Sequence, residues 1–360
     1  MLNGAMLNGA TVTVSRWVTG IALVTLAGCA QNADDSAETT HAALTDAPAS
    51  QVEQGNPEEA GKRIDVDEVH TVDLVVPIGQ GRKVHLVEKF TLRGLARRER
   101  RAILLLPGTI VKASFYDIDV DGYRFQSDLA KAGYITFASD YEGSGGSSYP
   151  DDGHSVTHSF LVDESRRVMQ AVRILSGVPR VDVLGESNGG SVASELCDDA
   201  FRTRTCVMAS MLYRTGTPMF YSVFLDPAFI AFIDGQPKGY MTTTADLYFN
   251  IVPRSPAPVA AEILAKQPGL FSVGTMLAPA HGLPWFDPTR ARVPGLVIQG
   301  TLDNTATQSD GDDLRDAYGS QGGGHAQLVR IEGAGLIPRI ENPPLNAQFE
   351  RIVLDFLEAH

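Results

Sequence analysis

The sequence predicts an α/β protein in which a mostly parallel, doubly wound sheet carries an inserted cap. Over most of residues 63–360, short apolar runs alternate with segments whose apolar residues have helical spacing. Two early runs instead alternate apolar and polar residues, as an antiparallel pair at a sheet edge does. Residues 213–292 interrupt the alternation with a stretch rich in aromatics and prolines. That stretch is too long for a structureless loop, so it predicts the cap.

The individual elements follow from the spacing of apolar residues along the chain. Residues 70–76 and 83–92 are the alternating runs expected to pair at the edge. Continuously apolar runs are expected to be buried strands, and runs with helical spacing to be helices. The expected strands are 103–106, which is continuously apolar and expected to be buried, and 134–139, 181–184, 206–209, 296–298 and 328–331. The expected helices are 123–132, 159–175, 191–197 and 349–357.

The first 62 residues are predicted to lie outside this domain. Arg16 precedes an apolar segment that ends in small residues, which matches a secretory signal peptide over residues 1–28 rather than a membrane span. Residues 29–62 have few large apolar side chains and many small, acidic and polar ones, so they predict a flexible acidic tether. The repeated Met-Leu-Asn-Gly-Ala at the start makes Met6 an alternative first residue.

The predicted signal peptide ends in Leu-Ala-Gly followed by Cys29, which resembles the lipobox of bacterial lipoproteins. In that family the signal is cut before the cysteine, so the resemblance implies a diacylated Cys29 that anchors the chain in a membrane. The protein would then lie in the bacterial cell envelope, facing the periplasm or the exterior. An ordinary signal peptide with a coincidental cysteine is the alternative.

Composition narrows the classes of partner and cofactor. The net charge is −13 and there is no basic stripe, which argues against a nucleic-acid partner. No set of His, Cys, Asp and Glu has metal-ligand spacing, and no dinucleotide or phosphate loop is present, so we expect no metal and no cofactor. The acidic cluster at 310–313 is expected to be a solvated helix start. We expect a monomer.

Two further cysteines, Cys197 and Cys206, would close a small loop between the helix after residue 190 and the next strand. In an exported protein such a pair is a disulfide candidate. Two reduced, partly buried thiols are the alternative, and the sequence leaves both open.

The motif that points most directly to chemistry is Gly-Glu-Ser-Asn-Gly at 185–189. It lies between the apolar run 181–184 and the helix-like segment 191–197, which is the strand–turn–helix context of a nucleophile elbow. A serine hydroxyl is a weak nucleophile, so it must be exposed and placed beside a base. Flanking glycines remove the Cβ atoms that would collide in the sharp turn. Ser187 is therefore the candidate nucleophile.

From about residue 69 to residue 360, the order of these parts resembles the α/β-hydrolase family. The segment 104–109 resembles the strand and oxyanion loop, 140–145 the loop after the fourth strand, and 300–303 the loop that carries the acid. The resemblance implies an α/β-hydrolase fold and an acyl-Ser187 intermediate. It also implies that Asp303 is the acid, and that the backbone N–H groups of Asn188 and Thr109 hold the oxyanion.

The base that the resemblance calls for is missing. The family usually presents Gly-x-Gly-His or similar after the last strand, whereas this chain reads Gly-Ala-Gly-Leu at 333–336. Leu336 stands where the histidine belongs, and leucine cannot accept a proton. In a triad that works as a unit, removing the base lowers kcat by about 10⁶-fold, or about 8 kcal/mol.

Other histidines are candidates for a replacement base, although each one alone is more readily explained as a surface or supporting residue. His325 precedes the last strand and is expected at the opposite end of the sheet from Ser187. His85 lies in an edge strand and His360 ends the chain. The remaining candidates are His154, His158 and His281.

Two functions from different classes fit the sequence. The first is a serine hydrolase of carboxylic esters or related acyl bonds, acting on a small apolar acyl substrate and impaired by Leu336. The second is a catalytically inactive protein on the same scaffold that binds a hydrophobic ligand. In either case aromatic residues of the cap could line the pocket or simply pack onto the core, and they are Phe220, Phe224, Phe229, Phe232, Tyr240, Tyr248, Phe249 and Trp285.

Overall fold

The computed structural model describes residues 4–7, 10–13, 22–23, 25–28, 65–266 and 269–360. Within the predicted signal peptide it gives only the short strands β1 (Gly4–Leu7), β2 (Ala10–Thr13), β3 (Ala22–Leu23) and β4 (Thr25–Gly28). Cys29 and the predicted tether lie outside the described residues. Among the helices of the described part, none has the length and apolarity needed to cross a membrane.

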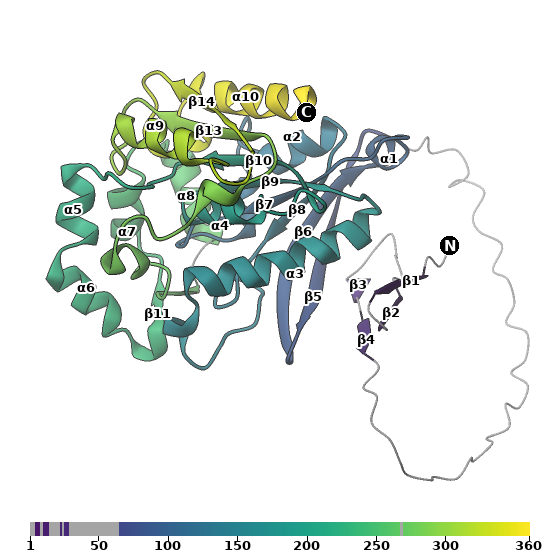
Figure 1. Ribbon diagram of the computed structural model, residues 1–360, viewed down its shortest axis with the longest axis horizontal. Coiled ribbons are helices and arrows are strands. Elements are labelled where there is room, and N and C mark those ends of the chain that lie inside the picture. Colours follow the sequence, from purple (N-terminus) through teal and green to yellow (C-terminus); the bar gives the residue numbers. More distant parts are fainter. Residues whose placement is uncertain (1–3, 8–9, 14–21, 24, 29–64, 267–268) are drawn as a thin grey trace, which may run out of the picture.

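A central sheet with helices on both faces forms the body of the molecule (Figure 1), which confirms the predicted fold class. Its strand order is β14-β13-β10-β9-β7-β8-β6-β5-β3. Neighbours from β8 to β14 run parallel, whereas β6 is antiparallel to both β5 and β8. The strands are β5 (Val69–Gly79), β6 (Arg82–Thr91), β7 (Ala102–Leu106), β8 (Ile135–Ser139), β9 (Val181–Glu186), β10 (Thr203–Ala209), β13 (Gly295–Gly300) and β14 (Ala326–Ile331).

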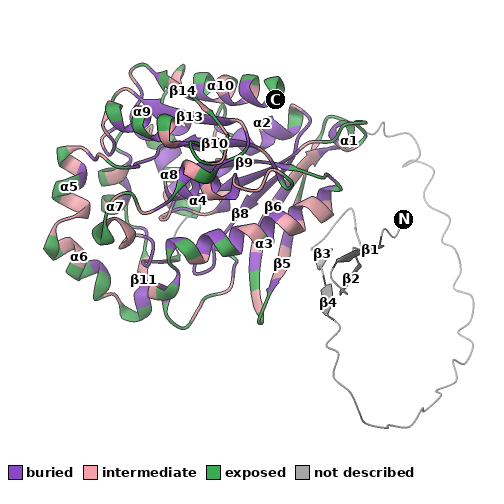
Figure 2. Ribbon diagram, viewed as in Figure 1, coloured by how far each residue is buried: buried purple, intermediate pink, exposed green. Residues whose placement is uncertain are grey.

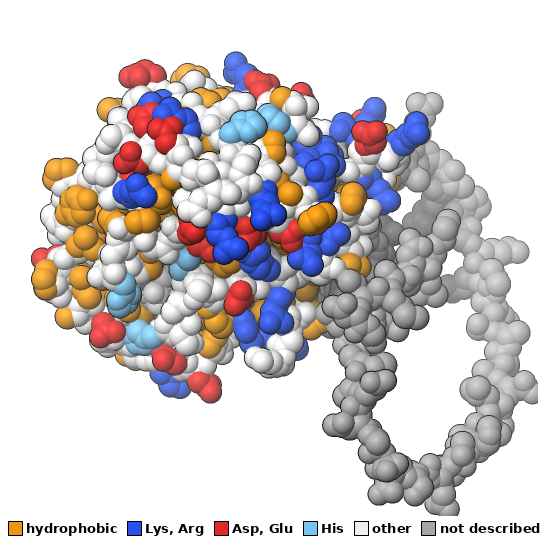
Figure 3. All heavy atoms as spheres, in the orientation of Figure 1, with side chains coloured by type: hydrophobic (Ala, Val, Ile, Leu, Met, Phe, Trp, Pro, Cys, Tyr) orange, Lys and Arg blue, Asp and Glu red, His pale blue; other side chains and the backbone are white. Residues whose placement is uncertain are grey.

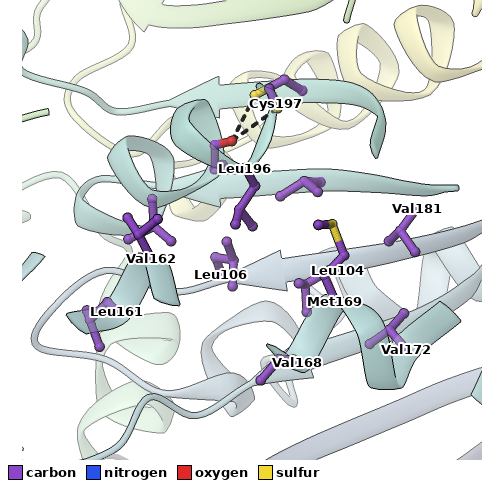
Figure 4. Packing of buried hydrophobic residues seen from close by; sticks show 14 of the residues in the cluster. Leu104, Leu106, Leu161, Val162, Val168, Met169, Val172, Val181, Leu196 and Cys197 are labelled. Atoms are coloured by element: carbon purple, nitrogen blue, oxygen red, sulfur yellow. Dashed lines mark hydrogen bonds between the residues drawn. The ribbon is translucent and has the colours of Figure 1, made fainter. Parts of the chain in front are cut away.

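The helices on the two faces bury alternate residues of the same strands, as the period of two along a strand requires. Leu104 and Leu106 of β7 pack with α3 (His158–Ser176) and α4 (Asn188–Leu196), as Figure 4 shows. Their neighbours on the opposite face pack with α2 (Phe125–Lys131) and α10 (Leu345–Ala359). The central strands are consequently buried along their whole length (Figure 2). The described part also contains α1 (Leu92–Leu95) and α9 (Gln308–Ala317).

Helix ends agree with the sequence signals to within a few residues. The helix expected at 159–175 is α3, His158–Ser176. Thr157 caps its start by accepting a hydrogen bond from the Phe160 amide, and Gly177 ends it with φ of +69°. These local signals therefore set the length of the helix that packs beside α4.

The inserted segment, residues 213–292, is folded, as its length predicts. Its strands pair antiparallel with each other, outside the central sheet. Figure 1 shows α5, α6 and α7 together beside the sheet, and Figure 3 shows hydrophobic side chains exposed over α5 and α6. The elements are α5 (Pro218–Phe224), α6 (Pro227–Asp234), β11 (Tyr240–Thr242), α7 (Ala245–Ile251), α8 (Ala257–Lys266) and β12 (Leu270–Ser272).

Both cysteines described by the structure are free and buried, so it shows the reduced alternative and not the disulfide. The Cys197 and Cys206 thiols both donate to the backbone oxygen of Ala193, at 3.0 and 3.4 Å (Figure 4). Burial raises the pKa of Cys197 well above its usual value. The thiols therefore behave as small apolar groups whose S–H groups donate weak hydrogen bonds to a carbonyl oxygen of α4.

The prediction that the acidic cluster at 310–313 is solvated is wrong for Asp310. Asp310 is buried and accepts hydrogen bonds from the amides of Tyr213, Arg214 and Thr215, at 2.6 to 2.7 Å. Asp313 is exposed, as expected. Asp310 thus ties the start of the inserted segment to α9, because a carboxylate can satisfy several successive backbone amides at once.

Candidate active site

The strand–turn–helix geometry predicted at 185–189 is present. β9 ends at Glu186, Ser187 has φ of 55° and ψ of −126°, and α4 begins at the next residue. A Cβ on Gly185 would lie 2.0 Å from the Gly189 oxygen, and one on Gly189 would lie 2.0 Å from the Leu106 oxygen. Both glycines are therefore required. Holding a serine in this backbone region stores about 1–3 kcal/mol of strain.

Two backbone amides beside Ser187 are available to a ligand. The loop after β7 passes close to the serine, since a Cβ on Gly108 would lie 3.3 Å from the Ser187 Cβ. Within the described part of the chain, neither the Thr109 nor the Asn188 amide donates a hydrogen bond. Asn188 is also the first residue of α4, where amides have no partner inside the helix. The pair suits an oxyanion.

Ser187 opens onto a mainly apolar cavity of about 120 Å³. The inserted segment supplies one side of it, through Phe220, Phe224, Ile251, Val252, Thr275, Met276, Pro279 and Trp285. Of the eight aromatic candidates, only Phe220, Phe224 and Trp285 line this cavity. Tyr248 is fully buried elsewhere, and Phe232 is 55% exposed. A cavity of about 150 Å³ holds benzene, so this space suits a group of about one ring.

Leu336 lines the same cavity as Ser187 and is buried at 5% exposure. It follows β14 after a turn in which Gly333 has φ of +76°, and it packs in a cluster that includes Ile337 and Val111. The position that the motif assigns to the base therefore faces the serine's cavity, but its side chain is apolar.

Asp303 lies three residues after the end of β13, and one of its carboxylate oxygens has no partner. Oδ1 accepts from the Thr305 amide at 2.7 Å, the Thr305 hydroxyl at 2.8 Å and the Ala306 amide at 3.1 Å. Oδ2 is buried and unpaired among the described residues. Burial raises the pKa of Asp303 to about 6, although the three hydrogen bonds lower it. An acid in this state lacks the donor that a histidine base would provide.

No histidine of the described residues lines the cavity of Ser187. His154 is held away from it, because its ring contacts Asp152 Oδ1 at 2.8 Å and the Asp234 oxygen at 3.0 Å. His158 is the first residue of α3, and its Nε2 lies 3.0 Å from Glu195 Oε1.

The other histidines are no better placed as bases. His281 is exposed in a 3₁₀ turn of the inserted segment, Ala278–His281. His85 is paired with Asp140, whose hydrogen bond raises the pKa of this histidine. The His325 oxygen accepts from the amide of Gly295, where β13 starts, so His325 lies at the opposite end of the sheet, as predicted. Among the residues that the structure describes, no histidine is therefore placed to act as a replacement base for Ser187.

A buried ion pair that the sequence did not predict lies beside Ser187. Arg339 donates to Glu186 at 2.7 and 3.0 Å, and both side chains are at most 3% exposed. The guanidinium also lies over the rings of Phe115 and Tyr116, 4.5 and 4.8 Å from their centroids. The pair joins the residue before Ser187 to the loop that carries Leu336. A glutamate at the end of an expected central strand was the available signal, because a buried charge needs a partner.

Comparisons with known proteins identify the family and support the fold. Residues 97–334 match the family described as serine aminopeptidase S33, whereas no curated protein matches the chain. A hydrolase from Pseudomonas aeruginosa PA01 has a similar structure, with a TM-score of 0.57 and 20% identity over 79% of this chain and 98% of that one.

Two further solved structures show the same fold. The thioesterase domain from the curacin biosynthetic pathway has a TM-score of 0.56 and 15% identity over 79% of this chain and 99% of its own. A carboxylesterase from Bacillus subtilis has a TM-score of 0.54 and 16% identity over 81% and 92%. With the family match covering most of the chain, the protein belongs to the serine aminopeptidase S33 family of α/β-hydrolases.

Proposed function

We propose that the protein is a serine hydrolase of carboxylic esters or related acyl bonds, impaired in this sequence by Leu336. The observation that carries the proposal is the buried, unpaired Oδ2 of Asp303, at the sheet edge that also presents Ser187. A carboxylate held in this way has no structural use for its second oxygen. The thioesterase and the carboxylesterase of similar fold support acyl-bond chemistry.

The proposed reaction assigns a step to each group. Ser187 Oγ attacks the acyl carbonyl carbon while its proton passes to a base, and the Thr109 and Asn188 amides hold the resulting oxyanion. The intermediate then expels the alcohol, which takes up that proton, and leaves an acyl-Ser187 ester. Water hydrolyses this ester by the same route. With leucine in place of the base the proton has no acceptor, which lowers the rate by about 10⁶-fold.

The proposed substrate is small and mainly apolar. The inserted segment acts as a cap in this proposal, because it supplies Phe220, Phe224 and Trp285 to the cavity. A cavity of about 120 Å³ favours a small acyl group. We also propose that the signal peptide is removed and that a lipid on Cys29 anchors the protein to a membrane. The protein would then be a monomer that acts on its substrate in the bacterial cell envelope.

Leu336 also favours a second candidate function, an inactive hydrolase scaffold that binds a hydrophobic ligand. An apolar side chain at this position adds to the apolar lining of the cavity. The two candidates differ in whether Ser187 is reactive. Covalent labelling by a fluorophosphonate requires an activated serine, whereas reversible binding does not.

The deciding experiment is hydrolysis of short p-nitrophenyl esters by the full chain, by Leu336→His and by Leu336→His/Ser187→Ala. We expect Leu336→His to gain several orders of magnitude in kcat/KM and to label faster with a fluorophosphonate, and the double variant to lose both gains. Leu270→His, which adds a histidine at an exposed position outside the cavity of Ser187, is the matched control. If Leu336→His and Leu270→His give the same rate, position 336 is not the site of the base.

A further inference from the structure

Three polar side-chain atoms in the residues that line the cavity are buried with no hydrogen-bond partner among the described residues. They are Asn188 Nδ2, Ser210 Oγ and Trp285 Nε1. Each of them can donate a hydrogen bond. Buried donors are almost always paired in folded proteins, so three orphans around one cavity call for an acceptor that enters from outside.

The three donors come from separate parts of the chain. Asn188 begins α4, and Ser210 follows β10 with φ of +61°. Trp285 belongs to the inserted segment, and its ring meets Phe286 edge-on at 5.7 Å, while Phe286 packs against Tyr213 at 5.3 Å. A left-handed backbone is unfavourable for serine and persists only where the surroundings impose it. These placements hold the donors in a fixed arrangement around the cavity.

The charges around the cavity indicate what kind of acceptor fits. No lysine or arginine is among the lining residues, so a carboxylate or phosphate would meet no cation. Glu186 lines the cavity, but Arg339 offsets its charge. Thr305, another lining residue, hydrogen-bonds Asp303, whose carboxylate forms no ion pair among the described residues and would repel an anion. A neutral oxygen therefore fits best.

We propose that Asn188, Ser210 and Trp285 form a subsite for a neutral oxygen of the substrate, separate from the carbonyl that Ser187 attacks. Suitable substrates are small esters or lactones that carry a second carbonyl or ether oxygen. The inference rests on the proposed function for the identity of the substrate as an acyl compound. Most of the remaining lining residues are apolar, which favours hydrocarbon for most of the rest of the substrate.

The test compares three probes of nearly equal shape on the full chain. Acetophenone has a neutral carbonyl oxygen, α-methylstyrene replaces that oxygen with a methylene group, and benzoate carries an anion. Trp285 reports binding by fluorescence, since the chain has only one other tryptophan, Trp17. Acetophenone should bind about 2- to 10-fold more tightly than α-methylstyrene for each hydrogen bond formed. Benzoate should bind least tightly.

Matched serine variants locate the contact. Ser210→Ala removes one orphan hydroxyl and should lower the preference for acetophenone by about 2- to 10-fold. Ser194→Ala removes a buried hydroxyl that is paired with the Ser191 oxygen and does not line the cavity, so it should leave the preference unchanged. Equal affinity for the three probes, no binding by any of them, or a preference that survives Ser210→Ala would overturn the subsite.

The outcome is independent of catalysis, because only binding is measured. If Leu336→His shows no esterase activity but the acetophenone preference depends on Ser210, the proposed reaction fails and the subsite stands. If Leu336→His is active and the probes bind alike, the reaction stands and the subsite fails.

Discussion

The Asp303 carboxylate is buried, and its Oδ2 has no hydrogen-bond partner among the described residues. We therefore expect Asp303→Asn to raise the free energy of unfolding in a pH-dependent way. In Asp303→Asn the amide oxygen can still accept the hydrogen bonds from Thr305 and Ala306 that Oδ1 accepts now. The amide nitrogen would take the place of the buried, unpaired Oδ2. The variant keeps the local turn and removes a charge that burial disfavours.

The size of the effect follows from the shift in the pKa of Asp303 from its usual 3.8 to about 6. A carboxyl group whose pKa is raised in the folded state favours folding below the unfolded pKa and loses that contribution as the pH rises through the folded pKa. The window therefore runs from about pH 4 to about pH 6. A shift of about 2.2 units at about 1.36 kcal/mol per unit gives about 3 kcal/mol.

The assay is urea unfolding of the wild-type chain and Asp303→Asn at pH 4 and at pH 7.5. The gain in unfolding free energy from Asp303→Asn should be about 2.4 kcal/mol larger at pH 7.5 than at pH 4, where the carboxyl of the unfolded chain is already partly ionised. Asp355→Asn, an exposed change on α10, should show no comparable pH dependence. A difference between wild type and Asp303→Asn that is the same at both pH values would refute the claim that this carboxylate is buried and unpaired.

Three further predictions concern the same site. Leu336→His supplies a donor to Asp303, so the pH dependence of the Asp303→Asn effect should shrink to below about 1 kcal/mol in that background, as measured by the same urea titrations. Glu186→Gln leaves the buried Arg339 without its counter-charge and should lower the unfolding free energy by about 3–5 kcal/mol; a loss under about 1 kcal/mol would contradict the pairing. Gly189→Ala places a Cβ 2.0 Å from a backbone oxygen of β7, so in the Leu336→His background it should abolish fluorophosphonate labelling and lower the melting temperature. Unchanged labelling in that background would show that the turn can adjust.

Much of the fold could be predicted because local sequence signals and burial act together in it. The strand expected at 181–184 is β9, Val181–Glu186, and the helix expected at 349–357 is α10, Leu345–Ala359. In both cases apolar spacing marked the buried part and missed only the ends. Ends depend on caps and turns rather than on burial, so periodicity alone does not fix them.

The contacts that the sequence did not predict are those that join distant segments. Asp310 was expected in solvent because its neighbours are acidic. It is instead buried, and it accepts hydrogen bonds from backbone amides almost 100 residues earlier in the chain. The ion pair of Glu186 with Arg339 likewise spans 153 residues. Spacing along the chain carries no information about such partners. Only the demand of a buried charge for a counter-charge could have indicated that one existed.

The unfavourable features of the site support the view that it was built around catalysis. Ser187 holds a strained backbone that stores about 1–3 kcal/mol, and glycine would relieve it. Burial of the charged Asp303 carboxylate, with its unpaired Oδ2, costs about 3 kcal/mol of stability, and asparagine would remove this cost. A scaffold that only binds an apolar ligand gains nothing from either feature. The proposed acyl-transfer site would use both features together with a base at position 336, and Leu336 is the residue that does not fit that proposal.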